Sequence, residues 1–265
     1  MGRKLKWICV TAVIFGGNVK IGILGGIGPE ATGRFYLELF RGLQQSGISG
    51  NRSFPQVVVN SIPAPELVGG TISDAQLLPY RTGLKQLDDS GVDFIAMVCN
   101  TIHLYRNELQ REIKTPIIDL RKEVRDALAK KGIKKAAVLG TRSTIEQGLY
   151  NFPEIEIIGI LPQEISELEN AIVLYNRGED RNSQRQAVRG IAEKYLAKGA
   201  EAVVLGCTEL AVMLEDFDIP KIDTLDVLVK ATIGHMDIPK IDTLDVLEHN
   251  RRAMVQYLFE NACGE

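Results

Sequence analysis

The chain has 265 residues, of which 45% are hydrophobic and 25% are charged, a composition typical of globular proteins that stay in water. A chain of this length can form one large α/β domain or two lobes of ordinary size. Its 31 Lys and Arg residues against 34 Asp and Glu residues give a formal net charge of −3, so we expect no nucleic-acid partner and no membrane partner.

Residues 1–18 are predicted to be an N-terminal extension outside the fold. Arg3, Lys4 and Lys6 precede an apolar run, as in a secretory signal, but no cleavage-site pattern follows. The run is shorter than the roughly 20 apolar residues of a membrane-spanning helix. A targeting signal is the alternative, and an extension would pack loosely or as an edge strand.

From residue 20 onward, short apolar runs alternate with amphipathic stretches of about ten to eighteen residues, as in strands joined by crossover helices. Strands buried on both faces are typical of parallel sheets, so the pattern predicts an α/β fold. The expected strands are 20–25, 56–62, 93–98, 116–119, 135–140, 156–161, 201–206 and 219–223. The expected helices are 32–43, 73–90, 101–113, 120–131, 144–151, 164–176, 183–198 and 208–215.

One segment occurs twice near the C-terminus. Residues 218–228 and 237–247 both read DIPKIDTLDVL. Two copies are too few to stack into a solenoid, so we interpret them as a tandem duplication. Only one copy can enter the sheet at a given place, and the other is expected in a surface turn or a lengthened C-terminal helix.

The cysteines are too few and too far apart for a disulfide scaffold or a zinc site. None of the three histidines belongs to a metal-binding pattern, so we expect no metal. Free thiols favour a reducing compartment, and the predicted location is the cytoplasm.

Cys99 and Cys207 each follow an apolar strand and precede a helix. Ligand crevices in doubly wound sheets lie beyond the carboxyl ends of the strands, so two facing lobes would bring both thiols to one site. Backbone N–H groups and the helix dipole at such a junction are expected to lower the pKa of a thiol. A buried Cys is otherwise a small hydrophobe, which is our interpretation of Cys9 and Cys263.

A glycine-rich stretch follows the first strand. Gly26, Gly28 and Ala31 satisfy the G-x-G-x-x-A pattern of dinucleotide-binding proteins. Such a protein would also need an acidic residue at the end of the second strand, where Asn60 and Ser61 stand instead. The glycines therefore favour a tight turn or a backbone approach to a small carboxylate over an NAD-dependent enzyme.

Four runs resemble the aspartate/glutamate racemase family in order and spacing: GILGGIGPEAT at 22–32, MVCNTIH at 97–103, LGTRSTIEQGLY at 139–150 and VLGCTEL at 204–210. The resemblance implies two similar flavodoxin-like lobes with parallel sheets and a cofactor-free site in the cleft between them. Residues 19–118 would form the first lobe, to which 219–265 return, and 119–218 the second.

The resemblance also implies a homodimer that racemises an amino acid, with aspartate or glutamate as the expected substrate. In the family's scheme one thiolate removes the α-proton while the opposing thiol protonates the other face, and Cys99 and Cys207 match those positions. Thiols suit both roles because acid and base forms can coexist near neutral pH.

Four further residues match positions that would stabilise the carbanion through its carboxylate: Asn100, Thr101, Thr144 and Thr208. Helix capping and turn formation are the alternative roles of these side chains. Glu209 either orients the neighbouring thiol or complements a helix dipole.

The chain departs from the family at the second strand. Archaeal aspartate racemases carry an Arg in a P-D-R segment there, whereas residues 62–66 read IPAPE. Arg177 is the preferred substitute, with Arg52 and Arg142 as alternatives, although Arg177 could equally be a solvated charge at a helix end. Asn60 is also expected to face the cleft.

Two other functions stay open on the sequence alone. One is a lyase or isomerase of the same superfamily, such as a malonate-type decarboxylase or a maleate isomerase. The other is a protein that binds an amino acid without turning it over.

Overall fold

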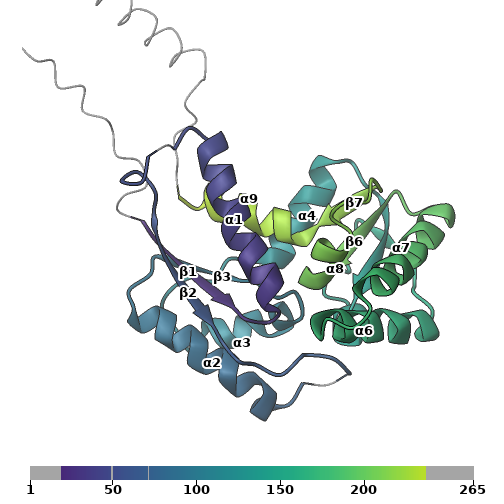
Figure 1. The fold of residues 1–265 in the computed structure, drawn as a ribbon, viewed down its shortest axis with the longest axis horizontal. Helices are drawn as coiled ribbons and strands as arrows, with labels where there is room; N and C mark the ends of the chain where they lie inside the picture. The colour runs from purple at the N-terminus through teal and green to yellow at the C-terminus, as the bar shows by residue number, and fades with distance from the viewer. Residues whose placement is uncertain (1–18, 49, 71, 237–265) are drawn as a thin grey trace, which may run out of the picture.

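The structure is a computed structural model that describes residues 19–48, 50–70 and 72–236. It contains two parallel sheets, one in each lobe (Figure 1). The first has the order β2-β1-β3, from β1 (Lys20–Gly25), β2 (Gln56–Ser61) and β3 (Phe94–Met97). The second has the order β5-β4-β6-β7, from β4 (Lys135–Gly140), β5 (Glu156–Ile157), β6 (Ala202–Gly206) and β7 (Lys221–Asp223). The predicted α/β class with two lobes is confirmed.

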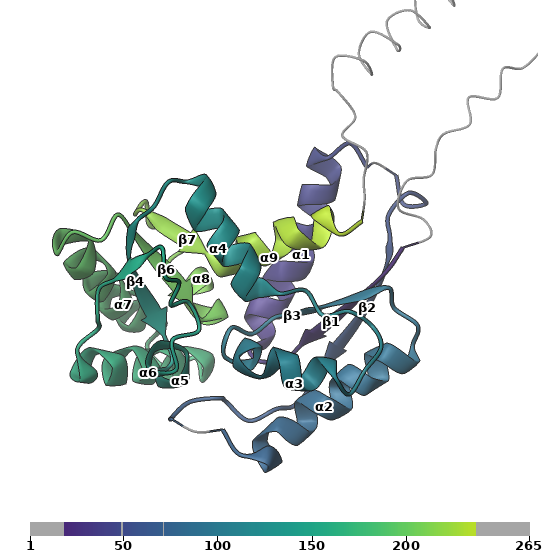
Figure 2. The ribbon, with the colours of Figure 1, turned by 180° about the vertical axis from the view of Figure 1, so that it is seen from behind.

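The helices lie on the faces of the two sheets (Figure 2). They are α1 (Pro29–Gln45), α2 (Asp74–Asp89), the 3₁₀ helix η1 (Thr101–Tyr105), α3 (Arg106–Gln110), α4 (Leu120–Lys130), α5 (Arg142–Glu146), α6 (Pro162–Asn176), α7 (Arg181–Ala197), α8 (Thr208–Met213) and α9 (Thr224–Gly234). Among the described residues, none of these helices has the length and apolar character that crossing a membrane requires.

The strand register brings the loops that follow the strands together. In the first sheet Leu24 pairs with Met97, so the β1–α1 loop and the residues after β3 leave from the same edge. In the second sheet Gly140 pairs with Gly206, so the starts of α5 and α8 are neighbours. Parallel strands thus deliver four strand-to-helix junctions to the region between the lobes.

Several strands are one or two residues shorter than predicted, and two predicted strands are largely missing from the sheets. The segment 116–119 makes only an isolated bridge between Ile95 and Ile117, because Asp119 already begins α4 by accepting a hydrogen bond from Lys122 N at 3.1 Å. The predicted strand 156–161 pairs with β4 over two residues only, and Pro162 then opens α6. The predicted helix 101–113 is divided into η1 and α3.

The first copy of the duplicated segment forms β7 and the start of α9. The Asp223 carboxylate caps the helix by accepting hydrogen bonds from Leu225 N at 2.9 Å and Asp226 N at 3.1 Å. Strand β7 pairs with β6 in the second sheet, which differs from the predicted return to the first lobe at residue 219. Helix α9, which follows, packs against α1 and α4. The second copy, 237–247, lies outside the described residues.

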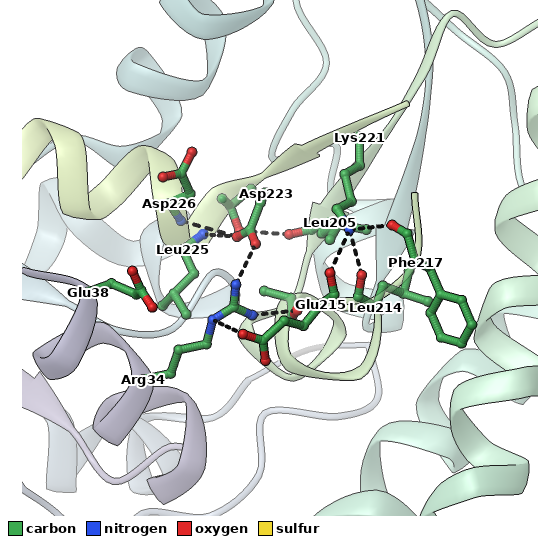
Figure 3. A network of polar contacts seen from close by, with 12 residues as sticks. Arg34, Glu38, Leu205, Leu214, Glu215, Phe217, Lys221, Asp223, Leu225 and Asp226 are labelled. Carbon is green, nitrogen blue, oxygen red and sulfur yellow. Dashed lines mark hydrogen bonds and ion pairs between the residues drawn. The ribbon is translucent and has the colours of Figure 1, made fainter. Parts of the chain in front are cut away.

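Arg34 of α1 connects the first lobe to the second (Figure 3). Its guanidinium donates to the Ala211 carbonyl oxygen at 2.5 Å and pairs with Asp223 Oδ2 at 3.3 Å. Lys221 lies nearby and donates to the carbonyl oxygens of Leu214 and Phe217 at 2.5 and 2.7 Å. The larger cluster of buried apolar side chains also extends through both lobes. Polar and apolar contacts therefore hold the lobes together behind the cleft.

Candidate functional site

A cavity of about 240 Å³ lies between the lobes. This is below the range of roughly 300–1,000 Å³ typical of pockets for drug-sized ligands, and it suits a molecule as small as an amino acid. The described residues that line it are Gly26, Ile27, Gly28, Pro29, Ala64, Glu66, Leu67, Val68, Cys99, Thr101, Thr141, Ile172, Asn176, Cys207 and Glu209. They come from the junctions after β1, β3, β4 and β6, from the segment after β2 and from α6.

The two cysteines at the strand ends lie on the wall of this one cavity. Cys99 follows β3 of the first lobe and is 8% exposed, and Cys207 follows β6 of the second lobe and is 7% exposed. The parallel register explains their meeting, since both strands end at the edge that faces the other lobe. Their position agrees with the sequence-based expectation, and their catalytic role stays a prediction.

Glu209 joins the second thiol to the first lobe. Its Oε2 accepts hydrogen bonds from Cys207 Sγ at 2.8 Å and from Thr208 Oγ1 at 3.2 Å, and its Oε1 accepts one from Gly28 N at 3.0 Å. A Cβ on Gly28 would lie 2.6 Å from that Oε1, so the carboxylate keeps this position only while residue 28 is glycine. Glu209 is 6% exposed and therefore a buried carboxylate held by groups from both lobes.

The pKa values of both thiols are raised, contrary to the expected lowering. Burial raises the pKa of Cys99 from 9.0 to about 12, and the Glu209 charge adds to the effect. Backbone N–H groups of Ile102 and Thr101 act in the opposite direction but do not offset burial. Burial also raises the pKa of Cys207 well above its usual value, followed by the Glu209 charge and the hydrogen bond to that carboxylate. Burial of the thiols therefore has a larger effect on their pKa than the backbone N–H groups and helix dipole on which the prediction was based.

Three threonine hydroxyls form a cluster beside Cys99. Thr101 Oγ1 lies 3.0 Å from Thr141 Oγ1 and 3.1 Å from Thr144 Oγ1, and the latter two oxygens are 3.2 Å apart. Thr101 and Thr141 line the cavity, whereas Thr144 is fully buried behind them. Thr141 is not among the site residues predicted from the sequence, although its place after β4 and before α5 matches the junctions that carry the two cysteines.

Asn100 and Thr208 are buried next to the thiols without lining the cavity. The Asn100 Oδ1 accepts a hydrogen bond from the Tyr150 hydroxyl, while its Nδ2 has no hydrogen-bond partner among the described residues. A buried amide without a partner is unfavourable by about 1–3 kcal/mol, so this N–H group is an available donor. The Thr208 hydroxyl donates to Glu209 and supports that carboxylate.

The structure does not bring Asn60 or Arg177 to the cavity. Asn60 Nδ2 donates to Gly83 O at 3.0 Å and Gln86 Oε1 at 2.8 Å, because this position of β2 faces α2. Arg177 is exposed at the end of α6, and the preceding residue, Asn176, lines the cavity instead.

The alternative arginines do not line the cavity either. The Arg142 guanidinium pairs with Glu146 at 2.7 Å and with Glu169 at 3.5 Å, both in the second lobe. Arg52 lies in the turn before β2 and is exposed. Among the described residues, the cavity wall therefore contains no Lys or Arg that could bind a second carboxylate.

Comparisons with known proteins agree with the two-lobe fold. The family model described as Asp/Glu/Hydantoin racemase matches residues 24–232. The broad specificity amino-acid racemase RacX of Bacillus subtilis is 30% identical over 223 residues, covering 80% of this chain and 96% of RacX. An aspartate racemase homologue from Pyrococcus horikoshii superposes with a TM-score of 0.63 at 25% identity, over 82% of this chain and 98% of that one. An aspartate racemase from Picrophilus torridus has the same fold, with a TM-score of 0.67 at 23% identity over 82% and 94% of the two chains.

Proposed function

The chain belongs to the Asp/Glu/Hydantoin racemase family, and from this premise we propose that Cys99 and Cys207 interconvert the enantiomers of an amino acid by proton transfer at its α-carbon. As a member of a family of racemases, the protein is an isomerase. The observation that carries the mechanism is the pair of buried thiols, one from each lobe, on the wall of one small cavity.

In the proposed reaction each thiol serves one face of the substrate. The thiolate of one cysteine accepts the α-proton as the Cα–H bond breaks, and the electron pair stays on the substrate as a carbanion. The thiol of the other cysteine then donates its proton to the opposite face. The product is the mirror image of the substrate, and the two sulfurs have exchanged protonation states, so the reverse reaction uses them in the opposite roles. Both transfers use only the thiols, so the proposal needs no cofactor.

One thiol must lose its proton before the reaction, although burial keeps both protonated at neutral pH. The α-ammonium of a bound amino acid would favour the thiolate, since an opposite charge within about 4–6 Å lowers a thiol pKa. Glu209 is placed to accept the proton of Cys207, because the thiol already donates a hydrogen bond to its Oε2. After turnover Cys207 holds the substrate's α-proton and Cys99 is the thiolate, so Glu209 keeps its proton until the reverse reaction has made Cys207 the thiolate again; the same hydrogen bond then returns it.

The developing negative charge is expected to be stabilised by hydrogen-bond donors around the substrate carboxylate. The hydroxyls of Thr101 and Thr141 lie on the cavity wall and are the donors in reach of a ligand. The Asn100 Nδ2, which has no partner among the described residues, lies behind the wall and would have to turn towards the cavity to join them. One donor of this kind typically contributes about 10²–10³ in turnover. Thr144 would act by positioning the two neighbouring hydroxyls.

The mechanism is tested in D₂O with single enantiomers of amino acids, by proton NMR together with chiral chromatography. Two opposed bases place deuterium in the newly formed enantiomer first, whereas one shared base would also label the remaining substrate at early times. Cys99→Ser and Cys207→Ser should each abolish racemisation, and Cys9→Ser and Cys263→Ser serve as matched controls with full activity. Full activity in either Cys99→Ser or Cys207→Ser would refute the two-thiol mechanism.

The expected homodimer and the expected cytoplasmic location stay predictions. Analytical ultracentrifugation of the full chain tests the first, and fractionation of the source cells tests the second.

A further inference from the structure

The wall of the cavity is acidic. Among the described residues that line it, the ionisable side chains are the two thiols and the carboxylates of Glu66 and Glu209. The aspartate or glutamate expected from the family resemblance would add a second carboxylate to this surface. Like charges at short range repel, and the repulsion is strongest where water is excluded.

The two carboxylates differ in what holds them. Glu209 accepts hydrogen bonds from Gly28, Cys207 and Thr208. Its carboxylate oxygens are therefore already occupied by groups of the protein. Glu66 makes no hydrogen bond or ion pair with another residue in the described part of the chain, and its residue is exposed at the cavity. Glu66 is thus the acidic group that a ligand can reach.

The backbone on both sides of Glu66 is held in place. On one side, the carbonyl oxygen of Pro65 accepts a hydrogen bond from Tyr80 Oη at 3.1 Å. On the other side, Leu67 is 4% exposed, and Gly69 N donates to Glu169 Oε1 of the second lobe at 2.9 Å. The segment 62–70 therefore crosses from the first lobe towards α5 and α6 (Figure 2), and it carries Glu66 past the cavity at a defined position.

The far end of the same segment is attached to the second lobe by its carbonyl groups. Ser143 Oγ donates to the Gly69 oxygen and, at 2.9 Å, to the Gly70 oxygen, and Gln147 Nε2 donates to the Gly70 oxygen at 3.0 Å. Together with the hydrogen bond from Tyr80 to Pro65, these contacts hold the backbone on both sides of Glu66. Its side chain is therefore the part of Glu66 that can change position.

We propose that the cavity selects an amino acid whose side chain ends in a cation, such as ornithine, lysine or arginine, and that Glu66 is the specificity-determining residue. This inference rests on the proposed racemase function. The α-carbon lies between the thiols, and the side-chain cation pairs with the Glu66 carboxylate through a charge-assisted hydrogen bond. Aspartate and glutamate are disfavoured because their distal carboxylate would lie near the Glu66 carboxylate, and the described residues of the wall offer no cation to pair with it.

The first test compares substrates of similar shape and different charge. Lysine and norleucine have the same four-carbon side chain, with and without the terminal ammonium, so their ratio reports the charge alone. We expect kcat/KM for lysine to exceed that for norleucine, aspartate and glutamate by about 10-fold or more, the lower end of what one hydrogen bond to a charged group contributes. Higher kcat/KM for aspartate or glutamate than for lysine would overturn the inference.

The second test changes Glu66. Glu66→Gln should raise KM for lysine about 10-fold with little change in kcat, because an interaction far from the reacting carbon contributes equally to ground state and transition state. KM for norleucine should change less than KM for lysine, and Glu66→Arg should shift preference towards glutamate. Glu167→Gln, an exposed carboxylate of α6 away from the cavity, is the matched control. Equal losses for lysine and norleucine in Glu66→Gln would show a structural role and overturn the assignment.

A binding measurement distinguishes failure of the proposed substrate specificity from failure of the proposed racemisation. A Cys99→Ser, Cys207→Ser protein cannot perform the proposed reaction, and lysine should still raise its melting temperature by mass action. Loss of that shift on adding Glu66→Gln supports the inference even if no amino acid is racemised by the unmodified protein. Equal shifts with lysine and glutamate, unaffected by Glu66→Gln, would overturn the inference while leaving the racemase proposal standing.

Discussion

The raised thiol pKa of Cys99 predicts that the protein loses stability in alkaline solution. The native state keeps the proton up to about pH 12, whereas the unfolded chain releases it near 9.0. Between these values the native state binds more protons than the unfolded state, so stability falls as pH rises. The contribution is fully present well below pH 9, begins to fall near pH 9 and is lost as pH approaches 12.

The magnitude follows from the width of that window. The unfolded thiol is half ionised at pH 9 and almost fully ionised at pH 10, so the Cys99 thiol alone should lower the free energy of unfolding by about 1 kcal/mol over this interval. The full window of three units would amount to about 4 kcal/mol. The thiol of Cys207 shifts in the same direction and steepens the decline.

Urea unfolding at pH 8, 9 and 10 measures this slope, and Cys99→Ser provides the comparison because a serine hydroxyl does not titrate in this range. Other alkaline groups, such as lysines and tyrosines, affect both proteins equally and cancel in the difference. The variant should lose less stability than the parent between pH 9 and pH 10, by about 1 kcal/mol. Parallel pH profiles for the two proteins would refute the conclusion that burial by the two lobes sets the thiol pKa.

Two further predictions concern contacts between the lobes. Gly28→Ala should place its Cβ 2.6 Å from Glu209 Oε1 and force the carboxylate to move. We expect racemase turnover to fall at least about 10-fold and the free energy of unfolding to fall by about 1 kcal/mol, the lower end of what overpacking costs. Unchanged turnover would show that the contact between Gly28 and Glu209 is dispensable. Arg34→Met should lower the free energy of unfolding by about 1–3 kcal/mol in urea, because its hydrogen bonds to Ala211 and Asp223 are partly buried. The matched control is Arg41→Met, whose pair with Glu38 is exposed and worth less than about 1 kcal/mol, and equal effects would contradict the connecting role of Arg34.

Elements with a strong local pattern could be predicted from the sequence. The strands β1 and β4 have the predicted bounds, because continuous apolar runs at the centre of a parallel sheet leave little choice of structure. The end of β5 was not predictable in this way, since its apolar run continues after the last residue that pairs with β4. The strand that pairs with a given segment comes from a distant part of the chain, so local periodicity does not predict where the pairing ends.

The sequence by itself determined the α/β class, the placement of Cys99 and Cys207 at strand ends, and the absence of the family's arginine from 62–66. These follow from local periodicity and from residue identity. Only the tertiary structure decided that burial raises the pKa of both thiols, that Glu209 joins Cys207 to Gly28, and that Asn176 rather than Arg177 reaches the cavity. Each of these depends on how two lobes close on one another, because burial and charge contacts across a cleft are set by residues far apart in the chain.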